Sequence, residues 1–270
     1  MSIPVLLNAL PGAVAQGLIW GIMAIGVYVT FRVLDIADLT VDGSMCTGGA
    51  VCIMMMLSGH NVLVSLIVAT LAGMAAGLLT GIFHTFMGIP AILAGILTQL
   101  ALYSINLKIM TKANQSISVD KYDLLVSLRF VKNVPWFQNT IFIVAILAVA
   151  LIAVLYWFFG REIGCALRAT GCNGNMARAQ GINTNFNKVL GLMISNGLVG
   201  LSSALLAQYQ GFADVNMGRG AIVIGLAAVI IGEAIFGKIF RNFAPVSYTH
   251  LDVYKRQVQM RLWHKICRIR

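Results

Sequence analysis

Long, continuous apolar runs constrain this chain more than any other feature. Of its 270 residues, 59% are hydrophobic and only 10% are charged, whereas soluble domains carry roughly 25% charged residues. A run of about 20 apolar residues can cross a bilayer as a helix, and these runs lack the alternation of a membrane barrel. The sequence therefore predicts an all-α, polytopic transmembrane bundle, with about seven spans in this fragment and more in the full-length protein. The expected spans are 11–31, 44–57, 62–83, 89–105, 140–159, 189–207 and 221–236.

Glycine is frequent in these runs, with 27 glycines in the chain. In the run 62–83, Gly73, Gly77 and Gly81 recur at every fourth position. Small residues at this spacing give a helix a smooth face, which lets another transmembrane helix approach its backbone. We therefore expect the span 62–83 to pack closely against a neighbour along this face.

The segment 160–188 is the longest polar interruption in the second half of the chain, and it separates two expected spans. Four basic residues stand there against one acid: Arg161, Arg168, Arg178, Lys188 and Glu162. A short helix is expected at 173–180 and should end at Gly181, because glycine readily takes the left-handed conformation of a helix stop. A helix outside the lipid, on a chain without a soluble domain, suggests a docking surface for a partner.

Three acids follow the first span at a membrane boundary, in the segment 34–51. The apolar run 44–57 is short for a span, so its helix either starts within the DLTVDG segment or is broken there. For Asp35 and Asp38, a solvated loop charge or a helix cap is the favoured interpretation. For Asp42, a cap on its own helix and a functional acid at membrane depth are equally plausible.

A few polar side chains stand within otherwise apolar spans. Such groups face protein or water rather than lipid, so they are candidates for lining a translocation pathway. Hydrogen bonding between helices explains each of them at least as well. The candidates are Thr40, Asp42, Ser44, Gln99, Asn196 and Ser203.

The five cysteines show no CxxC spacing and are expected to be reduced, unpaired thiols. The His, Cys and acidic residues show no ligand spacing, so the sequence predicts neither a metal site nor a cofactor nor an intramembrane enzyme. Positive charges on the loops leave the membrane orientation nearly undecided. A cleavable signal peptide is not expected, because residues 1–10 carry no basic region and the apolar stretch continues to full membrane length.

Three segments resemble the permease subunits of ATP-binding-cassette (ABC) importers, in the family that includes the branched-chain amino-acid permeases. They are DLTVDGSMCTGGAV at 38–51, the segment 89–114 and the segment 166–237. The last contains the most specific pattern, ALRAT followed by GIN at 181–183. The resemblance covers residues 1–243 and is greatest to permeases for tryptophan, tyrosine and related ligands.

The resemblance implies a type II importer fold in the bacterial cytoplasmic membrane, with the loop 160–188 on the cytoplasmic side. It implies three protein partners: an ABC ATPase, an extracellular solute-binding protein and a second permease subunit, with a homodimer expected. No GxxxxGK[ST] loop is present, so ATP hydrolysis is assigned to the partner rather than to this chain. The family's coupling helix corresponds to 169–181, and the implied ATPase contacts are Arg168, Ala169, Asn173, Arg178, Gln180 and Gly181.

The implied cargo is a small solute, expected to be an amino acid and possibly an aromatic one. The alternative is a secondary transporter driven by an ion gradient, which places acids near the bilayer midplane. Only Asp42 and Glu233 come close to that position, and no internal repeat is evident.

The permease domain is expected to comprise residues 1–244, and the tail 245–270 departs from the family. Residues 246–257, VSYTHLDVYKRQ, resemble a translated sequencing adapter. We therefore expect a non-native tail on a chain truncated at its C-terminus, and we do not expect the tail to form part of the permease fold. The other interpretation is a basic cytoplasmic tail attracted to anionic lipid.

Overall fold

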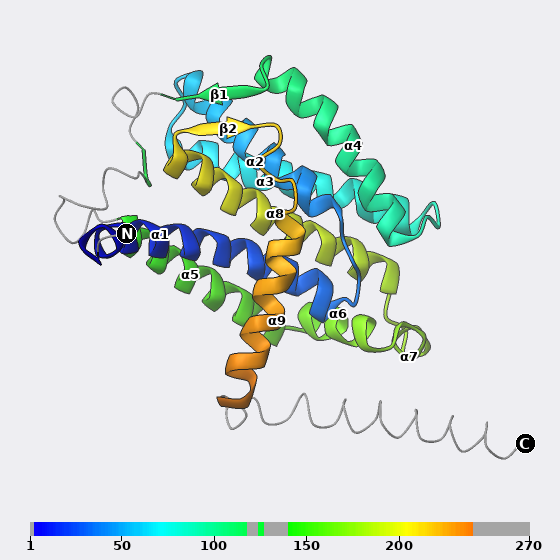
Figure 1. Ribbon diagram of the computed structural model, residues 1–270. Helices are drawn as coiled ribbons and strands as arrows, with labels where there is room; N and C mark the ends of the chain where they lie inside the picture. Colours follow the sequence, from blue (N-terminus) through cyan, green and yellow to red (C-terminus); the bar gives the residue numbers. More distant parts are fainter. Residues whose placement is uncertain (1–2, 118–123, 127–139, 240–270) are drawn as a thin grey trace, which may run out of the picture. The chain divides into compact units, whose positions relative to one another are not determined.

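The computed structural model describes residues 3–117, 124–126 and 140–239, and Figure 1 shows the arrangement of their helices. The chain divides into two units, Met1–Val229 and Ile230–Arg270. Every contact discussed below lies within the first unit. The expected non-native tail, 245–270, lies outside the described residues.

Helices dominate the described chain, as the apolar runs predicted. In chain order the elements are α1 (Ile3–Tyr28), the π-helical turn η1 (Val29–Val33), α2 (Thr40–Leu57), α3 (Val62–Thr85), α4 (Ala91–Met110), β1 (Asn114–Ser116), α5 (Thr140–Gly160), α6 (Glu162–Cys172), α7 (Gly174–Ala179), α8 (Thr184–Gln210), β2 (Phe212–Asp214) and α9 (Ala221–Ile239).

Six described helices are long and apolar enough to cross a membrane. They confirm the all-α, polytopic prediction and correspond to the first six expected spans. The seventh expected span, 221–236, forms α9, whose apolar part Ala221–Ile235 is shorter than the other six. The short run 44–57 is explained by α2, which begins at Thr40 within the DLTVDG segment.

Helices α2 and α8 are the most deeply buried spans, and α3 packs along α8. The predicted smooth face of α3 is confirmed at this contact. A side chain on Gly73 would collide with the carbonyl oxygen of Asn196, and one on Gly77 with that of Leu192. A side chain on Gly48 of α2 would likewise collide with the backbone of Gly200. The helices therefore pack backbone to backbone, which only glycine permits.

The first turn of α2 lies beside the middle of α8 rather than beside its end. Ser44 contacts Asn196, about halfway along α8, while Cys52 contacts Gln208 close to the C-terminal end of α8. The connection 34–39 therefore brings the chain from η1 to a helix start deep within the helix packing. Helix N-termini that begin inside a membrane protein are tolerated only where protein or water surrounds them.

Two short strands, which the sequence did not predict, join distant parts of the chain. β1 and β2 pair antiparallel, with Asn114 opposite Asp214 and Ser116 opposite Phe212 (Figure 1). This pairing holds the end of α4 next to the turn that leads from β2 into α9.

The packing of α3 on α8 gives a direct test. Gly73→Ala should lower the stability of the detergent-solubilised protein by about 1–3 kcal/mol, because the added methyl group overpacks the contact with Asn196. The matched control is Gly17→Ala, where an added Cβ meets nothing within 4 Å. The control should be neutral or slightly stabilising, since alanine favours helix. Equal thermal unfolding temperatures for the two variants would contradict the close packing.

Candidate functional site

A buried hydrogen-bonded cluster ties the start of α2 to the middle of α8. The Asn196 amide nitrogen donates to the Asp38 carboxylate over 2.6 Å, and its amide oxygen accepts from the Ser44 hydroxyl over 2.7 Å. Asp38 also accepts the backbone N–H of Thr40, in the first turn of α2. We call Asp38, Ser44 and Asn196 the Asn196 clamp. Because one amide satisfies two groups on the other segment, it fixes the register of α2 on α8.

Hydroxyl groups extend these contacts to α3 and α4. The Thr40 and Thr80 hydroxyls lie 2.7 Å apart, and Thr80 donates to Thr98 of α4 over 2.9 Å. On α8, Ser203 donates to the Met45 carbonyl oxygen of α2. Ser195 likewise donates to the Gly26 carbonyl oxygen of α1, over 2.7 Å. One polar layer thus connects five helices, where an unpaired group would be costly.

The structure separates the six pathway candidates into two groups. Thr40, Ser44, Asn196 and Ser203 are fully buried, and each bonds another helix. For these four, the structure shows the alternative interpretation, hydrogen bonding between helices. Asp42 and Gln99 instead line a cavity between α2 and α4. Their role in a translocation pathway stays a prediction.

The acids depart from their expected roles in two ways. Asp38 is not a solvated loop charge, since only 2% of its surface is exposed, and Leu39 rather than Asp38 holds the N-cap position of α2. Its carboxylate does accept the N–H of Thr40, the first residue of the helix. Burial raises the pKa of Asp38, and the hydrogen bonds from Thr40 and Asn196 oppose this shift. Asp42 does not cap its own helix but accepts the backbone N–H groups of Gly220 and Ile222, over 3.1 and 3.0 Å. It therefore caps α9, where a carboxylate complements the positive end of the helix dipole.

The cavity beside Asp42 has a volume of about 270 Å³, and we call it the α2–α4 cavity. Buried groups of α2, α4 and the β2–α9 turn form its floor, while three exposed residues, Leu100, Tyr103 and Arg219, stand at its edge. Both polar side-chain atoms of Asn106 are buried there without a hydrogen-bond partner among the described residues. The lining residues are Asp42, Gly43, Cys46, Gln99, Leu100, Tyr103, Asn106, Val215 and Arg219.

Sequence reasoning missed the contributions of Tyr103, Asn106 and Arg219 to this cavity. Gln99, Tyr103 and Asn106 follow one another at spacings of four and three, which places them on one face of α4. That spacing was a usable signal within the span. The contribution of Arg219 depends on the β1–β2 pairing, which no local sequence pattern predicted.

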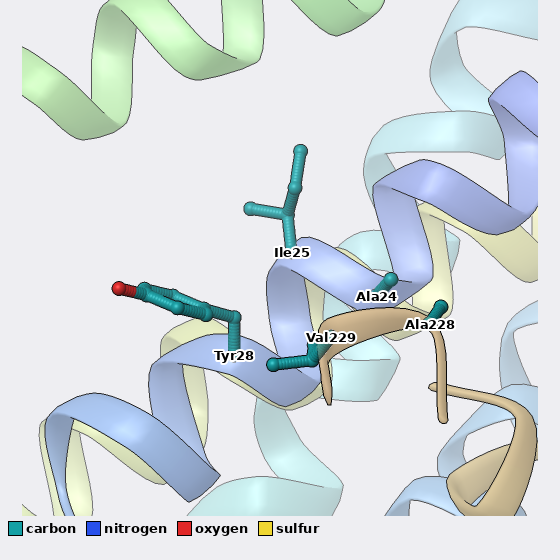
Figure 2. A pocket seen from close by; sticks show the side chains of 5 residues that line it. All are labelled: Ala24, Ile25, Tyr28, Ala228 and Val229. Atoms are coloured by element: carbon teal, nitrogen blue, oxygen red, sulfur yellow. The ribbon is translucent and has the colours of Figure 1, made fainter. Parts of the chain in front are cut away.

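A second cavity, of about 190 Å³, lies between α1 and α9 (Figure 2). Its lining is apolar except for the Tyr28 hydroxyl, which lies at the far end of that side chain in Figure 2. It offers space for apolar groups and little for specific polar recognition. The lining residues are Ala24, Ile25, Tyr28, Ala228 and Val229.

The polar loop 160–188 forms two helices where one was expected. The proposed coupling helix 169–181 is interrupted at Asn173, whose backbone is extended with φ −157° and ψ 95°. The Asn173 side chain accepts the N–H of Met176 over 3.1 Å, so it ends α6 and caps α7. The expected short helix at 173–180 corresponds to α7, and Gly181 takes the left-handed conformation as predicted, with φ 82°.

Two of the expected ATPase contacts bind their own chain. Arg178 donates to the Thr184 hydroxyl over 2.7 Å, at the start of α8, and Arg168 donates to the Phe159 carbonyl oxygen over 2.9 Å. Ala169 is half-buried, whereas Asn173, Gln180 and Gly181 are exposed. Met176 of α7 was not predicted, yet 58% of its surface is exposed. An exposed Met on a polar helix is typical of an adaptable contact surface.

Helix α6 is firmly attached to the core. Leu167 packs, fully buried, in a cluster with Leu34 and Leu192. A side chain on Gly171 would collide with the carbonyl oxygen of Val33 in η1. The Asn187 amide of α8 donates to the Thr170 hydroxyl over 3.1 Å.

The remaining reactive side chains form no further site among the described residues. Cys46, Cys52, Cys165 and Cys172 are free thiols, while Cys267 lies outside the described residues. Within the same residues, no group of three His, Cys, Asp or Glu could hold a metal ion.

Comparison with known proteins assigns the chain to a family. Residues 10–248 match the family "branched-chain amino acid transport system / permease component". The chain is 39% identical over 239 residues to the tyrosine transport system permease protein of Clostridioides difficile (strain R20291), covering 86% of this chain and 75% of that protein. It is 37% identical over 237 residues to an uncharacterised protein of Rickettsia prowazekii (strain Madrid E), covering 88% of this chain and 81% of that protein.

A more distant match is the autoinducer 2 import system permease protein LsrC of Yersinia pseudotuberculosis serotype O:1b (strain IP 31758), at 29% identity over 216 residues. That match covers 78% of this chain and 58% of LsrC. No solved structure gives a significant match. The chain belongs to the family of branched-chain amino-acid transport permeases: it is a multi-pass membrane subunit of an ABC importer, in the bacterial cell membrane. Nothing in these matches favours an ion-coupled secondary transporter.

The buried Asp38 makes stability depend on pH. Because its pKa is higher in the folded than in the unfolded protein, the folded state holds this proton more tightly. Its contribution therefore favours folding at low pH and is lost as the pH rises from the ordinary value of 3.8 through the raised pKa. Relative to Asp38→Asn, the wild type should lose stability over this rise in thermal unfolding measurements.

The matched control for this prediction is Asp35→Asn, which neutralises an exposed acid a few residues earlier. Asp35 has φ 58°, a conformation that Asn tolerates. The control should follow the wild type at every pH. Parallel pH profiles for the wild type and Asp38→Asn would show that folding does not raise the pKa of Asp38.

Proposed function

We propose that this permease imports a small amino acid, with an aromatic amino acid such as tyrosine as the first candidate. In this proposal a solute-binding protein delivers the cargo outside, and two copies of the chain surround the path. A separate ATPase docks on the loop 160–188 inside the cell. The observation that carries the proposal is the exposed tip of α7, held on a rigid base outside the spans.

The tip of α7 has the chemistry of a docking surface. Met176 presents an exposed apolar side chain, flanked by the exposed polar residues Asn175 and Gln180. Arg178 is exposed as well, but its bond to Thr184 also fixes the end of α7 on the start of α8. An apolar centre with a polar rim is the usual anatomy of a protein interface.

The base of α7 supports a mechanical role for this loop. A force applied to α7 passes into α6, which contacts both η1 and α8. From α8 it reaches α2 through the Asn196 clamp, since Asn196 bonds both Asp38 and Ser44. A movement imposed by the ATPase would therefore shift α2, α6 and α8 together, because the packed contacts leave little room for independent sliding.

The cargo assignment comes from the named relatives and from one feature of the chain. One relative is named for tyrosine transport and a more distant one for autoinducer 2 import, so cargo varies among the matched proteins. The greater identity and coverage favour an amino acid here. The α2–α4 cavity adds support, because it combines one carboxylate, one guanidinium and an aromatic ring: Asp42, Arg219 and Tyr103.

The docking role predicts that Met176→Asp prevents co-purification of the permease with its ATPase. A carboxylate at the centre of an apolar contact would be buried unpaired, which should weaken the complex at least roughly tenfold. Asn175→Asp, which adds the same charge at the neighbouring exposed position, is the matched control and should have a much smaller effect. Met176 is the sharper site than Arg178, since replacing Arg178 would also break its bond to Thr184.

Membrane insertion and thermal stability of the Met176 variant should equal those of the wild type, because 58% of the surface of this side chain is exposed. Co-purification of both variants at wild-type levels would remove α7 as the docking element.

A further inference from the structure

We propose that the α2–α4 cavity is a cargo site within the permease, which binds the carboxylate and ammonium groups of an amino acid during transit. This rests on the proposed function, because it takes the cargo to be an amino acid. It adds a binding step inside the membrane subunit, with Asn106, Arg219 and Asp42 as the recognising residues.

Asn106 is the observation that singles out this cavity. Its side chain is fully buried, and neither its amide nitrogen nor its amide oxygen has a partner among the described residues. Buried polar groups in native proteins are nearly always hydrogen-bonded, so an unpaired donor and acceptor on one side chain need an explanation. A ligand that offers both an acceptor and a donor would satisfy both atoms. A carboxylate with a neighbouring ammonium group is such a ligand.

The charged groups of the cavity match a zwitterion. Arg219 stands exposed at the edge, and its planar guanidinium can bind a carboxylate through two parallel hydrogen bonds. Asp42, which belongs to α2, also lines the cavity. Each of its carboxylate oxygens accepts one backbone N–H from the start of α9 and retains capacity for a further donor such as an ammonium group.

The size and walls of the cavity limit what it can hold. Its volume of about 270 Å³ is below the roughly 300 Å³ at which pockets for drug-sized ligands begin, so it suits a single small metabolite. Leu100 and Tyr103 provide apolar surface at its edge, where a cargo side chain would lie. Gln99 supplies a further amide in the lining. The cavity thus has charged groups for a cargo's main chain and an apolar edge for its side chain.

The cavity lies beside the start of α2, which the Asn196 clamp joins to α8. Asp42 and Gly43 belong to the first turn of α2, directly between Thr40 and Ser44 of the polar layer. A side chain on Gly218 would collide with the backbone of Asp42. The β2–α9 turn is therefore packed closely against the first helical turn of α2. Because residues of both α2 and α4 line the cavity, a displacement of α2 relative to α4 would change the contacts of a cargo bound here.

The test uses the purified permease–ATPase complex without solute-binding protein, and radiolabelled L-tyrosine as the probe. We expect saturable binding to the wild type. Asn106→Leu and Arg219→Gln should each weaken this binding roughly tenfold or more, because each removes hydrogen bonds to a charged group. Tyramine, which lacks the carboxylate, should compete poorly with tyrosine for binding to the wild-type complex. This preference for tyrosine over tyramine should disappear in Arg219→Gln.

Gln208→Met is the matched control for Asn106→Leu. Gln208 is also a fully buried amide with an unpartnered oxygen, but it lies outside the cavity. The control should bind tyrosine as the wild type does. If Asn106→Leu does not assemble, the exposed Arg219 still decides the question, since its replacement leaves the packed floor intact.

The results separate this proposal from the proposed function. Saturable tyrosine binding that is unchanged in both variants would overturn the cavity as the site. An absence of binding to the wild-type complex would overturn it as well. Amino-acid uptake by the complete system, with its solute-binding protein, tests the proposed function independently. Uptake without binding to the complex would retain the importer and reject the cargo site.

Discussion

The hydrogen bonds of Asn196 are the interaction on which the rest of this structure depends. An acid buried among transmembrane helices is stable only when its polar atoms are satisfied, and Asn196 donates to Asp38 from a neighbouring helix. The same amide accepts from Ser44, so both ends of the first turn of α2 are fixed to α8. This allows α2 to begin halfway along α8, inside the protein, instead of at a membrane surface.

Two consequences follow from that buried helix start. The β2–α9 turn can reach α2, where Asp42 caps α9 and the α2–α4 cavity is formed. At the other end of the connection 34–39, the end of η1 lies against Gly171 of α6. The loop proposed to bind the ATPase and the cavity proposed to bind cargo are therefore linked through one packed unit. Close glycine contacts of α3 and α2 with α8 leave that unit little freedom to deform.

The sequence predicted the parts of this architecture that depend on local patterns. Apolar run length predicted the spans, the Gly73–Gly77–Gly81 spacing predicted the face of α3 that packs on α8, and Gly181 predicted the end of α7. Contacts between distant segments escaped prediction. Asp42 looked like a cap for its own helix because its partner, α9, is far away in sequence. Asp38 looked solvated for the same reason, and the cavity needed the β1–β2 pairing to bring Arg219 to α4.

We expect α7, α8 and α2 to move as one body during transport. One spin label is placed on exposed Asn175 of α7 and the other on exposed Asn216, in the β2–α9 turn beside the cavity, with Cys165 and Cys172 replaced by Ser. Pulsed electron resonance then measures the distance between the two labels. If they do, the distance within one subunit stays unchanged when the complex binds ATP, while the distance between the two copies of Asn175 changes. A change within the subunit as large as that between subunits would show that these helices move separately.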